Sequence, residues 1–288
     1  MDISKKAVIA YVNDNTDKKA KNEIVNQLLK TVEINRNIDK DNISLAIRGS
    51  FFILNLDGKK TYIIAYVEND NKYNFVGVID SFITVQEIFL VPLRVSSENI
   101  VLVREFVDAL STSGEVGTFL RGYIYTDEAF EQIVSIVESF KAYSEGNFVS
   151  KNEENSRWQR IMSSSNIRWR NEKFPLIEVT KTQTHSLSSY DNEPHLPQDE
   201  YFDTIKTREI ESTYYWSQKF RHFILAEGHD RATSEEVAIL DDLSHSPFSL
   251  ISEFSERNKR YLVKYINGDI RMVEKSSIQV HEGGISIR

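Results

Sequence analysis

The chain of 288 residues contains no cysteine. This absence excludes disulfide scaffolds, thiolate nucleophiles and cysteine-ligated zinc or iron–sulfur sites. Long apolar runs are also missing, since no stretch approaches the roughly eighteen apolar residues of a membrane-spanning helix. The first fifteen residues, MDISKKAVIAYVNDN, have too short an apolar run for a signal peptide. We therefore predict no membrane partner and a cytoplasmic location, or a secreted one if a leader has been removed.

Signatures of catalysis and metal binding are scarce as well. No phosphate-binding glycine loop, nucleophile elbow or HExxH motif is present, and the six histidines are not three or four apart on any predicted helix. The sequence therefore predicts no metal and no cofactor. Glu178 and Lys181 resemble half of a nuclease site, but we interpret them as a charge pair at the end of a strand.

One segment departs from the overall charge balance. The chain carries a formal charge of −8, which argues against a surface that is basic throughout. Residues 157–170 (RWQRIMSSSNIRWR), here called the Arg/Trp segment, nevertheless contain four arginines, two tryptophans and no acid. Guanidinium groups bind phosphate and indole rings stack on bases. The composition therefore predicts a nucleic-acid-binding surface formed by Arg157, Arg160, Arg168, Trp169 and Arg170.

Periodicity predicts a helix near the N-terminus and then several strands. Apolar residues at helical spacing predict a helix over 16–32. Residues 43–79 show the alternation of three antiparallel strands, with a turn at Asp57-Gly58. Residues 82–93 predict a further, buried strand.

Further helices are predicted in the second and last thirds of the chain. Residues 96–110 and 126–146 carry apolar side chains three and four apart. The helix over 126–146 would place Glu138 and Lys141 one turn apart. A strand is expected over 174–180 and an aromatic helical segment over 201–225, and a capping box from Thr233 to Glu236 predicts a short helix.

These elements predict an α+β fold, mainly an antiparallel sheet with packed helices, plus a C-terminal helical segment and a β-hairpin. We expect a core domain over residues 1–180. Residues 181–200 have few apolar groups and two prolines, which predicts a linker or long loop. Residues 201–288 would form the helical segment with its terminal hairpin.

Part of this order resembles the ribosome-inactivating proteins. The strand containing Tyr62 is similar to the segment that supplies a base-stacking tyrosine in that family. IVESFKAYSE is similar to its central helix, with Glu138 and Lys141 at the matching charged positions, and ENSRWQRIMSSS to its tryptophan segment, with Trp158 as the counterpart. The resemblance covers residues 43–180.

The resemblance implies an RNA-directed N-glycosidase, with RNA or the ribosome as partner. Tyr62 would stack on an adenine, Glu138 would stabilise the oxocarbenium-like centre, Lys141 would assist the departing base and Trp158 would floor the site. Lys141 stands where the family has arginine, which implies impaired activity because lysine lacks the planar fork. The family's second tyrosine has no match here.

Two alternatives remain open. The chain is a non-enzymatic factor that binds nucleic acid or protein through the Arg/Trp segment, or an enzyme of nuclease type with an unrecognised site. A structural interpretation stands beside both: Tyr62 packs within a sheet, and Trp158 and Trp169, eleven residues apart and thus on one helical face, anchor a core.

The C-terminus carries a strong hairpin pattern. RYLVKYI and DIRMVEKSSIQV flank Asn267-Gly268, a dipeptide that suits a type I′ turn. The segment resembles strands of SH3-like or Tudor barrels but is too short to close a barrel alone. We therefore expect a small satellite sheet on the main core.

Overall fold

The computed structural model describes residues 2–4, 8, 18–31, 43–56, 60–69, 72–94, 98–110, 114–126, 129–144, 157–170, 175–190, 195–251 and 259–281. The predicted Asp57-Gly58 turn and the ends of several predicted helices, at residues 96–97, 127–128 and 145–146, lie outside these ranges. The chain divides into two compact units. The first unit comprises residues 1–92, 98–106 and 121–132, and the second comprises residues 93–97, 107–120 and 133–288.

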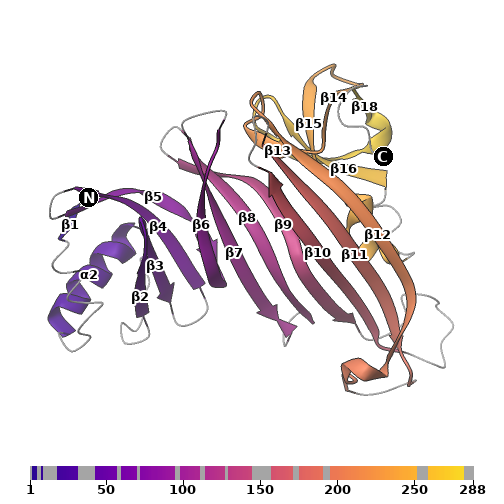
Figure 1. Ribbon diagram of the computed structural model, residues 1–288, viewed down its shortest axis with the longest axis horizontal. Coiled ribbons are helices and arrows are strands. Elements are labelled where there is room, and N and C mark those ends of the chain that lie inside the picture. The colour runs from indigo at the N-terminus through magenta and orange to yellow at the C-terminus, as the bar shows by residue number, and fades with distance from the viewer. Residues whose placement is uncertain are drawn as a thin grey trace. The chain divides into compact units, whose positions relative to one another are not determined.

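A five-stranded antiparallel sheet and a helix begin the first unit (Figure 1). The sheet has the order β1-β5-β4-β3-β2, so β2, β3 and β4 each pair with the next strand along the chain, and β1 pairs with β5. Its elements are β1 (Asp2–Ser4), α2 (Lys18–Thr31), β2 (Ile43–Arg48), β3 (Phe51–Leu56), β4 (Lys60–Asn69) and β5 (Lys72–Phe82). The predicted helix over 16–32 is confirmed over its described part, Lys18–Thr31. Residues 43–79 form strands as predicted, but there are four rather than three, because a turn at residues 49–50 divides the first into β2 and β3.

The two faces of this sheet belong to two cores. Val25 and Leu28 of α2 are buried against Phe52 and Leu54 of β3, which explains why the helix keeps its apolar residues at helical spacing. Phe51 and Ile63 enter a second core that includes Val101, Val103 and Tyr123, all within the first unit. Alternation along β3 therefore supplies both cores.

An eight-stranded sheet follows in chain order, from β6 to β13. Among the described residues, every strand pair with a defined register is antiparallel. The strands are β6 (Thr84–Pro92), β7 (Asn99–Ala109), β8 (Glu115–Thr126), β9 (Ala129–Ser144), β10 (Gln159–Arg170), β11 (Leu176–Ser188), β12 (Phe202–Ser217) and β13 (His222–Ile224).

This sheet overturns the predicted α+β fold. The segments predicted as helices over 96–110, 126–146 and 201–225 contain instead, in their described parts, the strands β7, β9, β12 and β13. Ile, Val, Phe and Tyr are frequent in these segments and favour strands when neighbouring strands supply hydrogen bonds and packing. Their helical spacing arose because a strand buried in part on both faces does not alternate strictly. The protein is therefore rich in antiparallel β-sheet.

Three shorter predictions are corrected too. Residues 181–188 continue β11, so the expected loop over 181–200 begins only after Ser188. The strand predicted over 82–93 exists as β6, but most of its side chains are exposed rather than buried. The expected short helix is absent at Thr233, whose hydroxyl contacts Glu235 in a turn before β15 (Glu236–Asp242).

Within the second unit, one face of β9 to β12 is covered by short helical turns. The turns are η3 (Leu243–His245) and η4 (Pro247–Leu250). Arg208 of β12 donates to the Ser246 carbonyl and the Ser249 hydroxyl, and its Nε donates to Gln183 of β11. The Phe140 and Phe248 rings pack edge to face. We call this the covered face of the sheet.

The chain ends in a second five-stranded sheet with the order β17-β16-β15-β14-β18. The predicted hairpin is confirmed as β16 and β17, and the sheet has its own core around Val237, Val263 and Ile278. Its elements are β14 (Ala226–Asp230), β15, β16 (Arg260–Tyr265), β17 (Ile270–Glu274), η6 (Lys275–Ser277) and β18 (Ile278–Val280). No helix among the described residues is long and apolar enough to cross a membrane.

Candidate functional site

Strand geometry separates the two charged residues of the predicted glycosidase site. Glu138 and Lys141 both lie on β9, three residues apart. On a helix this spacing would place them on one face, whereas on a strand successive side chains alternate. Glu138 and Lys141 therefore project to opposite faces of the sheet. Tyr62 belongs to the first unit, where it packs beside the α2 core.

The Arg/Trp segment is a strand, and alternation divides it as well. Arg160, Arg168 and Arg170 share the face opposite the covered one, while Trp169 projects to the covered side. The Trp169 ring packs edge to face on Phe223, and its buried Nε1 has no hydrogen-bond partner among the described residues. The indole is thus part of the packing on that side.

The arginines on the shared face form an extended row. Arg168 follows Arg160 by eight positions, which on a strand is about 26 Å at roughly 3.3 Å per residue. Arg168 lies directly across from Glu178, and Arg170 forms a 2.9 Å ion pair with the same carboxylate. Arg157 is exposed at the start of the segment, and Trp158 is half buried. The predicted arginines therefore do not form one compact basic patch.

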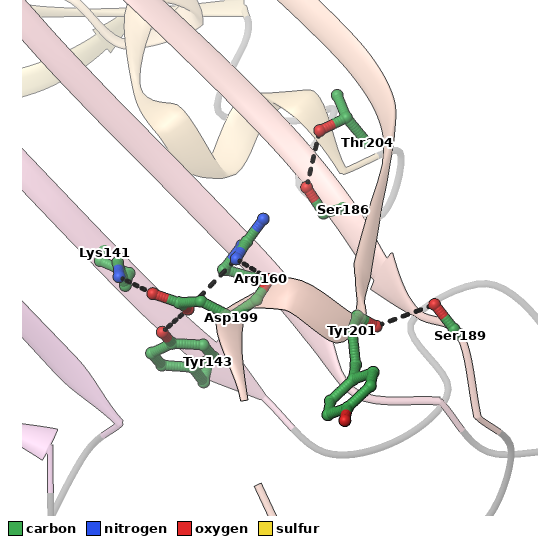
Figure 2. Close-up of polar contacts among 8 residues, drawn as sticks. All are labelled: Lys141, Tyr143, Arg160, Ser186, Ser189, Asp199, Tyr201 and Thr204. Atoms are coloured by element: carbon green, nitrogen blue, oxygen red, sulfur yellow. Dashed lines mark hydrogen bonds and ion pairs between the residues drawn. The ribbon is translucent and has the colours of Figure 1, made fainter. Parts of the chain in front are cut away.

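Arg160 instead meets residues from two other elements (Figure 2). Its cross-strand neighbour is Tyr143 of β9, and Lys141 lies two residues before Tyr143 on the same face. All three side chains reach Asp199, the first residue of the short helical turn η2 (Asp199–Tyr201). We call Lys141, Tyr143, Arg160 and Asp199 the Asp199 cluster.

Both carboxylate oxygens of Asp199 accept hydrogen bonds. Lys141 Nζ donates to Oδ2 at 2.6 Å, the Tyr143 hydroxyl donates to Oδ1 at 2.6 Å, and Arg160 donates to Oδ1 at 3.1 Å. These donors, led by Lys141, lower the pKa of Asp199 to about 2. The same contact with Asp199 raises the pKa of Lys141. Asp199 and Lys141 are therefore both charged at neutral pH.

Arg160 is the buried member of the cluster. Arg160 is only 7% exposed, and its guanidinium lies 4.8 Å from the centre of the Phe202 ring. The guanidinium also donates to the backbone carbonyl of Asp199, but its Nε is buried and has no hydrogen-bond partner in the part of the chain that the structure describes. Asp199 thus leaves part of the hydrogen-bonding capacity of Arg160 unused, which is costly for a buried charged group.

The turn that carries Asp199 is tied to the sheet at its base. Ser189 donates from its backbone N–H to the Tyr201 carbonyl at 2.7 Å and from its hydroxyl to Asp203 at 2.9 Å. Ser186 and Thr204 also form a hydrogen bond nearby. In Figure 2 the Tyr201 ring points away from the carboxylate of Asp199. The centres of the Tyr201 and Tyr190 rings are 5.3 Å apart. Both tyrosines are exposed, at 38% and 52%.

The arrangement suits an anionic group and not a metal. Two cations and a phenol hydroxyl converge on one carboxylate, so the contacting side chains other than Asp199 are all donors. Within the described parts of the chain, no group of three or more His, Asp or Glu side chains could hold a metal ion. The cluster therefore has the chemistry of a carboxylate-binding site.

Of the predicted site residues, the structure brings together Lys141 and Arg160. Trp158 lies near them along the chain, and its backbone exchanges hydrogen bonds with Ser188 at the end of β11. Tyr143 and Asp199 were not predicted from the sequence. Tyr143 would have been found had β9 been predicted as a strand, because alternation pairs it with Lys141. Asp199 carries no local signal, since its partners lie far earlier in the chain.

Comparisons of the chain with protein-family models, with curated proteins and with solved structures found no match.

Proposed function

We propose that this chain is a non-enzymatic protein-binding factor that recognises a carboxylate side chain of an acidic partner through Lys141, Tyr143 and Arg160. The observation that carries the proposal is the convergence of these three donors on the carboxylate of Asp199. Exposed Tyr190 and Tyr201 offer apolar contact beside the charges.

A protein partner fits this face better than nucleic acid does. A polyanion that followed β10 from Arg160 to Arg170 would meet Glu178 on β11, which already pairs with Arg170. Glu209 and Glu211 of β12 lie across from Thr182 and Thr180 on the same face. These carboxylates repel phosphates, whereas a single acidic side chain needs only the end of the strand.

The N-glycosidase hypothesis finds no comparable support. It requires Glu138 and Lys141 on one face, and β9 places them on opposite faces. We therefore expect no adenine release when ribosomes are incubated with the protein. Release that disappears in Glu138→Ala would contradict this expectation and restore the enzyme hypothesis.

The binding proposal is tested with a fluorescein-labelled heptapeptide that carries two aspartates around a tyrosine. Fluorescence anisotropy should detect binding, and the matching asparagine peptide should bind more weakly. Lys141→Met should reduce affinity about tenfold, because a hydrogen bond to a charged group contributes about 1.5–3 kcal/mol. Arg168→Met is the matched control, since it removes a cation on the same face of β10 far from Asp199.

Two results would reject the proposal. One is equal affinity of the wild type and Lys141→Met for the acidic peptide. The other is a labelled single-stranded RNA that binds more tightly than the peptide and loses affinity in Arg168→Met, which would identify the row of arginines as a nucleic-acid-binding surface.

A further inference from the structure

The Asp199 cluster is already occupied by a carboxylate of the chain itself. Lys141 holds one oxygen of Asp199, and Tyr143 and Arg160 hold the other. A partner's aspartate or glutamate would need the same three donors. The two carboxylates cannot share them, because like charges at such close distance repel and the donors are limited in number.

The Asp199 side chain can leave the cluster without moving its backbone. Its side chain is 55% exposed, in contrast to the 9% of Arg160. The backbone of the turn has its own contacts, since Arg160 donates to the Asp199 carbonyl at 2.9 Å and the Tyr201 N–H donates to the Gln198 carbonyl at 3.0 Å. Rotation about the two side-chain bonds of Asp199 would therefore release Lys141, Tyr143 and Arg160 from the carboxylate while the turn stays in place.

We propose that Asp199 is a built-in competitor that occupies the carboxylate-binding site until an acidic partner displaces it. This inference rests on the proposed function. The tethered aspartate engages only one terminal nitrogen of the Arg160 guanidinium, through its backbone carbonyl and its Oδ1. The carboxylate of a partner is not tethered to the η2 backbone, so it can approach the three donors from the direction that gives the best hydrogen-bond geometry.

The competition sets the strength of binding. A site that is vacant for only a fraction of the time binds its ligand more weakly by that fraction. A tethered carboxylate also has a high effective concentration, in the millimolar range or above for short connections. Removing the Asp199 carboxylate should therefore tighten partner binding. A purely structural ion pair predicts the opposite, because its loss would loosen the turn and the cations that it positions.

The test measures the affinity of the full-length chain for the labelled aspartate heptapeptide. We expect Asp199→Ala and Asp199→Asn to bind at least about fivefold more tightly than the wild type. Asp203→Asn is the matched control: it removes one nearby negative charge, and its carboxylate contacts Ser189 rather than Lys141. Its affinity should stay within about twofold of the wild type.

Each outcome separates this inference from the proposed function. Unchanged or weaker peptide binding by both Asp199 variants, with circular dichroism of a folded protein, would overturn the competitor, and loss of binding in Lys141→Met would leave the binding site standing. Absence of peptide binding by every variant, Asp199→Ala included, would overturn both. Equal gains in Asp199→Asn and Asp203→Asn would show a general charge effect and also overturn the competitor.

Discussion

At the scale of single residues, Arg160 and His222 are both buried but differ in the partners that their polar atoms have. Arg160 is buried but keeps contacts with Asp199 and the Phe202 ring. His222 of β13 is also buried, and its Nδ1 has no hydrogen-bond partner among the described residues. A buried imidazole without an acceptor resists protonation, because the charged form loses its hydration. Protonation of His222 at acidic pH is therefore unfavourable in the folded protein.

We predict that His222 makes folding sensitive to acid. Burial, with a smaller contribution from Lys264, lowers the pKa of His222 from 6.5 to about 3. The unfolded chain consequently binds more protons between these pH values, so the free energy of unfolding falls as the pH drops from 6.5 towards 3. Urea unfolding across this range should show a smaller fall for His222→Phe than for the wild type.

The exposed His195 provides the control for this prediction. His195→Phe should follow the pH dependence of the wild type. Parallel curves for His222→Phe and the wild type would contradict a neutral, buried His222.

At the scale of elements, close contacts between neighbouring strands constrain particular positions. Gly114 lies just before β8, and its carbonyl accepts the Tyr143 N–H at 2.9 Å. Its φ is +71°, a conformation that residues with a side chain adopt only at a cost. An added Cβ would also lie 2.5 Å from the Tyr143 carbonyl oxygen. The end of β9 that presents Tyr143 therefore depends on a glycine here.

We predict that Gly114→Ala lowers the free energy of unfolding by more than about 2 kcal/mol, because a backbone clash adds to the strain of positive φ. Gly268 is a matched control, since its φ is +93° and nothing lies near its missing Cβ. Gly268→Ala should cost only about 1 kcal/mol. Urea unfolding of the two variants measures the difference, and equal losses would show that the contact with Tyr143 is unimportant.

The covered face depends on a second kind of contact, hydrogen bonds from β11 and β12 to the turns η3 and η4. Arg208→Met would leave the Ser246 carbonyl and the Gln183 side-chain oxygen without their donor. We predict a loss of about 2–4 kcal/mol in the free energy of unfolding. The exposed Arg168→Met should change it by less than about 0.5 kcal/mol. Similar values for both variants would contradict a role of Arg208 in holding the turns.

At the scale of the whole molecule, the chain passes between its two units several times. The first unit needs residues 98–106 and 121–132 in addition to the N-terminal 92 residues. Its second core joins Phe51 and Ile63 of the first sheet to Val103 and Tyr123 from those later segments. A cut after the first sheet would expose that apolar face to water.

We predict that a fragment of residues 1–82 binds the dye ANS and aggregates, whereas a fragment of residues 1–132 does not. The longer fragment retains Val101, Val103 and Tyr123, which cover Phe51 and Ile63. ANS fluorescence and size-exclusion chromatography measure the outcome. A monomeric 1–82 fragment without ANS binding would show that the first sheet and α2 suffice for a stable fold.

Local pattern determined some elements of this protein on its own. The helix α2, the β character of residues 43–79 and the hairpin at Asn267-Gly268 follow from spacing and turn chemistry within one segment, although the turn between β2 and β3 was not predicted. The Arg/Trp composition likewise drew attention to Arg160. Such features could be predicted because the residues that cause them are neighbours in sequence.

Tertiary structure alone decided the rest. Val134, Val137 and Phe140 fit a helix or a strand equally well, and hydrogen bonding to adjacent strands selected the strand. As a result, Lys141 lies on the face of the sheet opposite to Glu138 and on the same face as Tyr143. The strand conformation of β9 also allowed Asp199, which is distant in sequence, to contact both Lys141 and Arg160. Residue types fixed which charges the chain possesses, but only the register of β9 with β10 and the position of η2 determined which of them meet, because strand pairing and long-range contacts leave no mark on local spacing.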